Sequence, residues 1–172
     1  MTKKLCFVFS FATLIALDSA ADSTNRLHFP VAGFTITPLE APPSESPQQV
    51  LIMLLPPTEG FAANVNVQIQ RYTGTIEDYV ALSLQQFKSA GLTVLEERMS
   101  SKSVAVFGYT GGQPGGLRHC YARAEKSGGS VYLATGTATP AQWNKEADRI
   151  KACVDSFRCE SGAPANAAPP RR

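Results

Sequence analysis

The sequence has few of the residues on which metal sites depend. It contains two histidines and four cysteines, and no two cysteines are spaced as CxxC. The ligand spacing of a structural zinc site is therefore missing. Acidic residues occur as direct neighbours, Glu77 with Asp78 and Glu96 with Glu97, and this is not the arrangement that encloses calcium. We expect no metal and no cofactor.

Features that bind phosphate or nucleic acid are also missing. The net charge is only +2, and no basic block precedes the terminal Arg171 and Arg172. The glycine-rich stretch GGQPGG, residues 111–116, leads into an expected strand, whereas a phosphate-binding loop leads into a helix. We therefore predict no nucleic-acid partner and no binding to a membrane surface.

The N-terminus has the three-part pattern of a secretory signal peptide. Lys3 and Lys4 precede a mostly apolar run at residues 5–17, and small residues follow at 19–21. The run is shorter than the ~20 apolar residues that a permanent membrane helix needs. No cysteine lies just after the run, so a bacterial lipoprotein anchor is not indicated. We predict an exported protein, periplasmic or secreted, without a stable membrane anchor after cleavage.

The remaining chain has the size of one domain. Removal of residues 1–21 leaves roughly 150 residues, near the commonest domain length. The polar residues 22–27 are expected to be mobile. Residues 159–172 are rich in proline and alanine and are expected to be disordered. A single domain is predicted between them, at residues 28–158.

Strand patterns dominate the first half of this domain. A short strand is expected at residues 34–37. The apolar run at 50–55 is bounded by Pro56 and Pro57, and it predicts a strand buried on both faces. In the next strand, at 64–71, Val65, Val67 and Ile69 alternate with amides. The amides form one uncharged polar face and are the candidate binding surface: Asn64, Asn66, Gln68 and Gln70.

Two helices are marked by their N-terminal caps. Thr75 with Asp78 begins a helix over residues 76–90, and Thr139 with Gln142 begins one over 140–157. Between them, turn residues separate four more strands. The sequence thus predicts an α+β fold in the order βββαββββα, with a mainly antiparallel sheet of about seven strands and two main helices.

Two stretches resemble the PsbP-like superfamily. They are PPTEGFAANVNVQIQRYTGTIEDYVALSLQQFKSAGLTVLEER, residues 56–98, and VYLATGTATPAQWNKEADRIKACVDSF, residues 131–157. The resemblance extends over residues 29–157 and implies an α/β/α sandwich. The superfamily includes an extrinsic subunit of photosystem II, a Ran-binding import factor and bacterial envelope proteins of unassigned role. The resemblance implies that the protein is a binding or assembly module, and it provides no shared catalytic residues.

Two features that suggest chemistry have simpler structural explanations. His119 and Cys120 are neighbours in an expected strand, so their side chains face opposite sides of the sheet and cannot act as a catalytic pair. Cys120 is interpreted as a buried, small apolar residue. Trp143 falls in phase with the apolar stripe of the second helix and is interpreted as a core residue.

Three cysteines remain after export, when a disulfide is permitted. A bridge between Cys120 and Cys153 is disfavoured. Their expected positions along the parallel strand and helix differ by ~10 Å, more than the usual ~4.4–6.8 Å between bridged Cα atoms. If a disulfide forms, we expect it between Cys153 and Cys159. Three free thiols are the alternative.

The leading functional hypothesis is an exported, non-enzymatic binding or assembly module of the cell envelope. The partner would be an unidentified protein or a polar ligand. The alternative is a small secreted hydrolase or a carrier of an apolar ligand, and this leaves the question of enzymatic activity open. Convergent titratable groups in a pocket would favour the enzyme, and an apolar cavity would favour the carrier.

The signal peptide gives the first testable prediction. Because Ser19, Ala20 and Ala21 provide the small residues that cleavage needs, the mature protein should begin at Asp22. Mass spectrometry of the exported protein would show this N-terminus. An intact Met1 in the membrane fraction would contradict the prediction.

Overall fold

The structure is a computed structural model that describes residues 26–39 and 46–160. The predicted signal peptide, residues 22–25 and the tail from residue 161 lie outside the described residues. The described chain falls into two units, which divide between residues 41 and 42 and are treated separately below.

The first unit contains a small hairpin. β1 (Leu27–Phe29) pairs antiparallel with β2 (Phe34–Ile36), and the rings of Phe29 and Phe34 stack at 4.8 Å. Gly33 closes the turn with a φ of 75°, a conformation that glycine adopts at little cost. The expected strand at residues 34–37 is therefore present, but its partner is β1.

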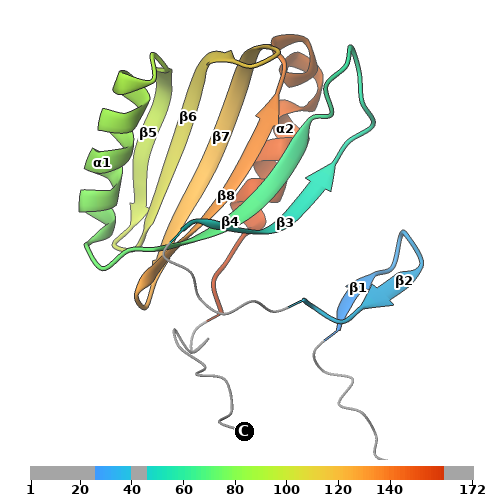
Figure 1. The fold of residues 1–172 in the computed structure, drawn as a ribbon, viewed down its shortest axis with the longest axis horizontal. Helices are drawn as coiled ribbons and strands as arrows, with labels where there is room; N and C mark the ends of the chain where they lie inside the picture. The colour runs from blue at the N-terminus through green and yellow to red at the C-terminus, as the bar shows by residue number, and fades with distance from the viewer. Residues whose placement is uncertain (1–25, 40–45, 161–172) are drawn as a thin grey trace, which may run out of the picture. The chain divides into compact units, whose positions relative to one another are not determined.

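The second unit is built on a six-stranded, fully antiparallel sheet (Figure 1). The strand order is β3-β4-β8-β7-β6-β5. The strands are β3 (Gln48–Leu54), β4 (Asn64–Arg71), β5 (Thr93–Ser101), β6 (Val104–Gln113), β7 (Gly116–Ser127) and β8 (Ser130–Ala138). The predicted α+β class and antiparallel sheet are confirmed. Six strands rather than about seven form this sheet, because β2 belongs to the hairpin.

The two helices lie on opposite faces of the sheet. α1 (Ile76–Ser89) packs on β5 and β6, and α2 (Pro140–Ser156) packs on β4, β7 and β8 (Figure 1). Both predicted capping boxes are present: the side chain of Thr75 accepts from the Asp78 N–H, and that of Thr139 from the Gln142 N–H. Neither helix of the described chain is long and apolar enough to span a membrane.

Each helix buries a separate apolar cluster against the sheet. On one face, Ile76, Tyr79 and Val80 of α1 pack on residues that include Phe107. On the other, Ile150 and Val154 of α2 pack on residues that include Tyr121. Full burial of a valine or isoleucine contributes roughly 1.5–3 kcal/mol, so these contacts fix where each helix lies.

The apolar run of β3 is not buried on both faces, and that prediction is wrong. β3 is an edge strand, and Val50, Ile52 and Leu54 are 55%, 47% and 62% exposed. The physical reason is the placement of the helices, because α1 packs on β5 and β6, α2 packs on β4, β7 and β8, and neither helix packs extensively on β3. An apolar run alone does not distinguish a central strand from such an edge.

The helix α2 approaches the sheet closely at Gly136 of β8. A Cβ atom at this position would lie 2.1 Å from Cγ2 of Ile150 and 3.5 Å from Cγ2 of Val154. The missing side chain is therefore what lets α2 lie this close to the strand.

Gly136→Ala should destabilise the protein by about 1–3 kcal/mol, because the added methyl group overpacks the contact with Ile150. Denaturant unfolding followed by circular dichroism would measure the change. Gly129→Ala is the matched control, since nothing lies within 4 Å of a Cβ atom there. Equal stability of the two variants would show that α2 is not in close contact with β8.

Candidate functional site

The amides predicted from the sequence share one face of β4. The register pairs Asn66 with Thr135 and Gln68 with Leu133, so this row lies on the face that α1 packs on. All four amide residues are half-buried. We call this surface the amide face and define it by Asn64, Asn66, Gln68 and Gln70.

Only the ends of this row are engaged by side-chain hydrogen bonds. Gln70 accepts a hydrogen bond of 3.0 Å from the hydroxyl of Tyr79 on α1. Asn64 donates through Nδ2 to the carbonyl of Ala62 at 3.1 Å. Within the described chain, the side chains of Asn66 and Gln68 have no hydrogen-bond partner. Two half-buried amides therefore keep free donors and acceptors in the middle of the row.

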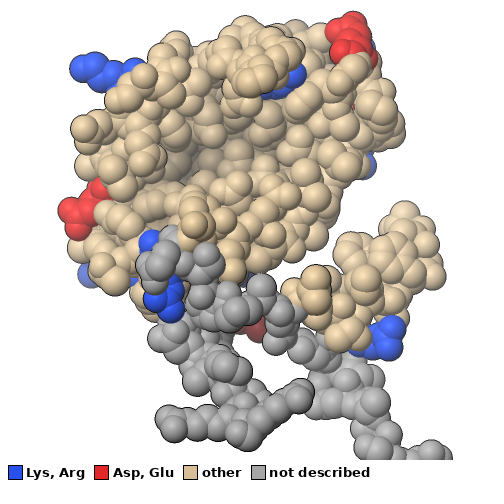
Figure 2. Space-filling view, viewed as in Figure 1, with Lys and Arg blue, Asp and Glu red and all other residues tan. Residues whose placement is uncertain are grey.

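The surroundings of the amide face are uncharged and concave. Figure 2 shows a hollow without charged residues between α1 on the left and β3 and β4 on the right. Half-buried Thr137 continues the polar surface onto β8, and exposed Ile52 and Leu54 flank it on β3. This surface can provide hydrogen bonds beside apolar contacts and has no charge to attract ions.

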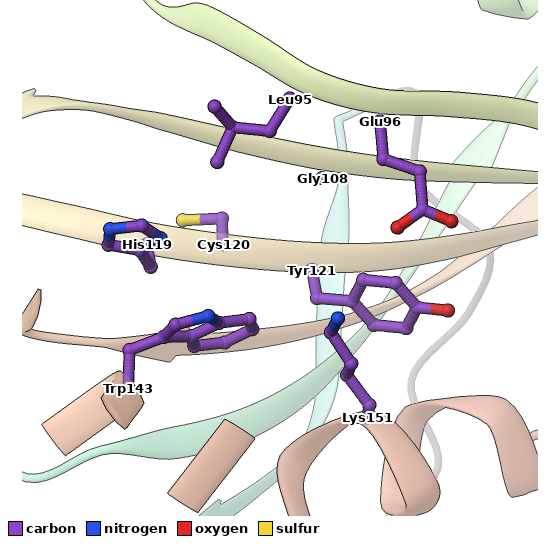
Figure 3. Close-up of a pocket in the computed structure, with 8 residues that line it drawn as sticks. All are labelled: Leu95, Glu96, Gly108, His119, Cys120, Tyr121, Trp143 and Lys151. Carbon is purple, nitrogen blue, oxygen red and sulfur yellow. The ribbon is translucent and has the colours of Figure 1, made fainter. Parts of the chain in front are cut away.

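A second surface, which the sequence did not reveal, lies on the opposite face beside α2. It is an open cleft of about 240 Å³ (Figure 3). We call it the α2 cleft; its lining residues are Leu95 and Glu96 of β5, Gly108 of β6, His119, Cys120 and Tyr121 of β7, and Trp143 and Lys151 of α2.

A β-bulge directs Glu96 into this cleft. Val94 pairs with Tyr109 but Glu96 pairs with Gly108, so Leu95 is an extra residue in β5. In a regular strand Glu96 would lie opposite Phe107, on the face packed by α1. The bulge moves it to the face of α2, a known use of bulges. Gly108 leaves room for it, because a Cβ atom there would lie 3.1 Å from Cβ of Glu96.

The hydroxyl of Tyr121 is held in a polar network beside the cleft. It donates to the carboxylate of Asp155 at 3.0 Å and accepts from Nη2 of Arg98 at 3.2 Å. Arg98 also donates through Nε to Oε1 of Glu96 at 2.9 Å. Burial is the main cause that raises the pKa of Tyr121, so the ring stays a neutral phenol in the physiological range.

Lys151 and two stacked rings complete the cleft. The ammonium of Lys151 lies 5.3 Å from the ring centroid of Tyr121 and 5.9 Å from that of Trp143. The imidazole of His119 stacks on Trp143 with centroids 5.5 Å apart. No carboxylate of the described chain forms an ion pair with Lys151.

The structure places His119 and Cys120 on opposite faces, as predicted. His119 contacts Trp143, whereas the thiol of Cys120 lies 3.8 Å from Oγ1 of Thr137 on the α1 side. Cys120 is 4% exposed, which confirms it as a buried residue. Trp143 is only half-buried: it packs on the core and also lines the cleft, so the prediction of a purely core role is incomplete.

No group of described residues has the composition of a metal site. In the described chain, no hydrogen bond joins His119 to a carboxylate or to a nucleophile. Instead, His119 stacks on Trp143, and Lys151 lies near the rings of Tyr121 and Trp143. Glu96 accepts a hydrogen bond from Arg98 of the Tyr121 network.

Comparison with known proteins gives similarity at the level of the fold. No protein-family profile and no curated protein matches the sequence. A crystal structure of PA94, a Pseudomonas aeruginosa protein of unknown function for which a regulatory role has been suggested, superposes with a TM-score of 0.54 and 16% identity. The match covers 79% of this chain and 96% of that one. The solution structure of CyanoP, the PsbP of the cyanobacterium Synechocystis sp. PCC 6803, matches with a TM-score of 0.43 and 15% identity, over 57% of this chain and 68% of that one.

The chain shares the fold of PA94. The α/β/α sandwich that the sequence resemblance implied is confirmed by the structure, in which the sheet lies between two helices. At such low identities the likeness concerns the fold alone, and function has to be argued from the surfaces of this chain.

The three cysteines of the described residues have free thiols in the structure. The bridge expected between Cys153 and Cys159, if a disulfide forms, stays a prediction. Cys120 lies on the α1 side, whereas Cys153 packs on the core beneath α2, so these two cannot pair. The backbone N–H of Cys159 donates to Oε1 of Glu125 at 3.1 Å. Burial, followed by the Glu125 carboxylate, raises the pKa of Cys159 to about 11.

This shift predicts slow alkylation of Cys159. In reduced, folded protein at about pH 8, iodoacetamide should label Cys159 more slowly than in unfolded protein, because the thiolate is the reacting species. Labelling should accelerate as the pH rises toward 11. The same shift lowers stability as the pH rises above the unfolded thiol pKa of about 8.5, where only the unfolded state has lost the proton.

Peptide mapping after a timed pulse would locate the label, and mapping without reduction would detect any bridge. Equal labelling rates in the folded and unfolded protein would contradict the raised pKa.

Proposed function

We propose that the protein is an exported, non-enzymatic binding module of the cell envelope that contacts its partner through the amide face. The observation that carries the proposal is the row of half-buried amides with no hydrogen-bond partner at Asn66 and Gln68. Amide donors and acceptors that the described chain leaves unused are available to a bound partner, which can form hydrogen bonds with them.

The chemistry of the surface defines the kind of partner. Amide side chains donate and accept equally well, so they suit peptide groups or hydroxyl groups rather than ions. Exposed Ile52 and Leu54 beside the row add apolar area. We therefore propose an uncharged, partly apolar polypeptide segment as the partner.

Export rests on the N-terminal pattern of the sequence, residues 1–21. The network around Tyr121 keeps the hydroxyl hydrogen-bonded on both sides, which favours a structural role over proton transfer.

The double variant Asn66→Ala, Gln68→Ala should lose its partner without losing stability. Immobilised mature protein would be incubated with the envelope fraction of its own source, and captured components would be identified by mass spectrometry. We expect the amount of partner captured by the variant to be lower than that captured by the wild-type protein by a factor of about ten or more, because two central contacts are lost. Its unfolding free energy should stay within about 0.5 kcal/mol.

The control is Gln85→Ala, Asn144→Ala, which makes the same chemical changes at exposed positions on α1 and α2. It should capture the partner like wild type. Undiminished capture by the Asn66, Gln68 variant would show that the amide face is not the contact surface.

A further inference from the structure

The α2 cleft holds two opposite charges that do not pair with each other. Lys151 contributes an ammonium and Glu96 a carboxylate, and no ion pair joins them. In Figure 3, Glu96 and Lys151 extend toward the ring of Tyr121 from different sides of the cleft. A cation and an anion that line the same small space without contact leave a gap that a third group can bridge.

Each of the two charges keeps binding capacity. Glu96 uses Oε1 for Arg98, and Oε2 has no hydrogen-bond partner among the described residues. Lys151 contacts only ring faces, at Tyr121 and Trp143, and its three N–H donors have no carboxylate acceptor in the described chain. Arg98 is already engaged by Glu96, Ser100 and Tyr121, so it does not compete for a ligand.

The walls and the size of the cleft restrict the ligand further. Leu95, which is 58% exposed, together with Trp143 and His119 forms an apolar and aromatic wall beside the charges. The volume of about 240 Å³ is below the ~300–1,000 Å³ usual for drug-sized ligands. The occupant must therefore be small.

We propose that the α2 cleft binds a small zwitterion of the amino-acid class. Lys151 holds its carboxylate, Oε2 of Glu96 accepts from its ammonium, and its side chain lies against Leu95 and Trp143. The site lies on the opposite face of the sheet from the amide face, so it is independent of the proposed function.

The chain carries its own reporter for this site, because Trp143 is its single tryptophan. Mature protein would be titrated with L-phenylalanine, L-leucine and L-serine while tryptophan emission is followed. At least one should give a saturable change. For L-phenylalanine, two analogues each delete one charge: 3-phenylpropanoate lacks the ammonium and 2-phenylethylamine lacks the carboxylate. Each analogue should bind at least about tenfold more weakly, as expected for loss of a charged hydrogen bond.

Two variants test the assigned contacts. Lys151→Met keeps the length of the side chain without its charge, and Glu96→Gln removes the negative charge; each should weaken binding about tenfold or more. Lys145→Met, on the exposed side of α2, is the matched control and should bind like wild type. The proposal is overturned if none of the three amino acids gives a saturable change, if the single-charge analogues bind equally well, or if Lys151→Met leaves binding unchanged.

Discussion

The position of α2 on the sheet depends on one close contact, between Gly136 of β8 and Ile150 of α2. Because β8 has no side chain there, the helix can approach closely enough to bury Ile150 and Val154 together. This contact centres α2 over β4, β8 and β7, and α2 has no extensive contact with β5 or β6, although Val106 of β6 is buried in the same cluster. On the other face α1 contacts β5 and β6, while Asn66 and Gln68 of β4 stay half-buried. Each helix therefore contacts only part of its face of the sheet, and the two parts lie toward opposite ends.

The two proposed surfaces differ in chemistry because the strands that form them differ in pattern. β4 alternates amides with branched apolar residues, so its open face is polar and uncharged. β5 carries Glu96 and Arg98, and its bulge turns Glu96 toward Lys151 and the rings beside α2. One sheet thus presents an uncharged surface suited to a polypeptide and a small charged cleft suited to a zwitterion. These are the surfaces through which we propose that the protein works.

Local signals in the sequence were enough for the helices and for the amide face. Thr75 and Thr139 mark both helix starts through capping boxes, and strict alternation places Asn66 and Gln68 on one face. The exposure of β3 could not be predicted from the sequence, because it depends on which strands the helices pack on. The α2 cleft could not be predicted either, because Glu96, His119 and Lys151 are far apart in the sequence. In addition, the bulge at Leu95 moves Glu96 to the face opposite the one that simple alternation assigns to it.

Solvent exposure of individual side chains tests the accessibility of the two proposed surfaces most directly. Isotope-labelled mature protein would be examined by NMR with an uncharged, soluble gadolinium complex, which broadens the signals of accessible groups. The account predicts strong broadening of the side-chain amides of Asn66 and Gln68 and of the indole N–H of Trp143, with the buried methyl groups of Val154 protected. If the amides of Asn66 and Gln68 are as protected as Val154, then the face opposite α2 is covered, and the account is contradicted.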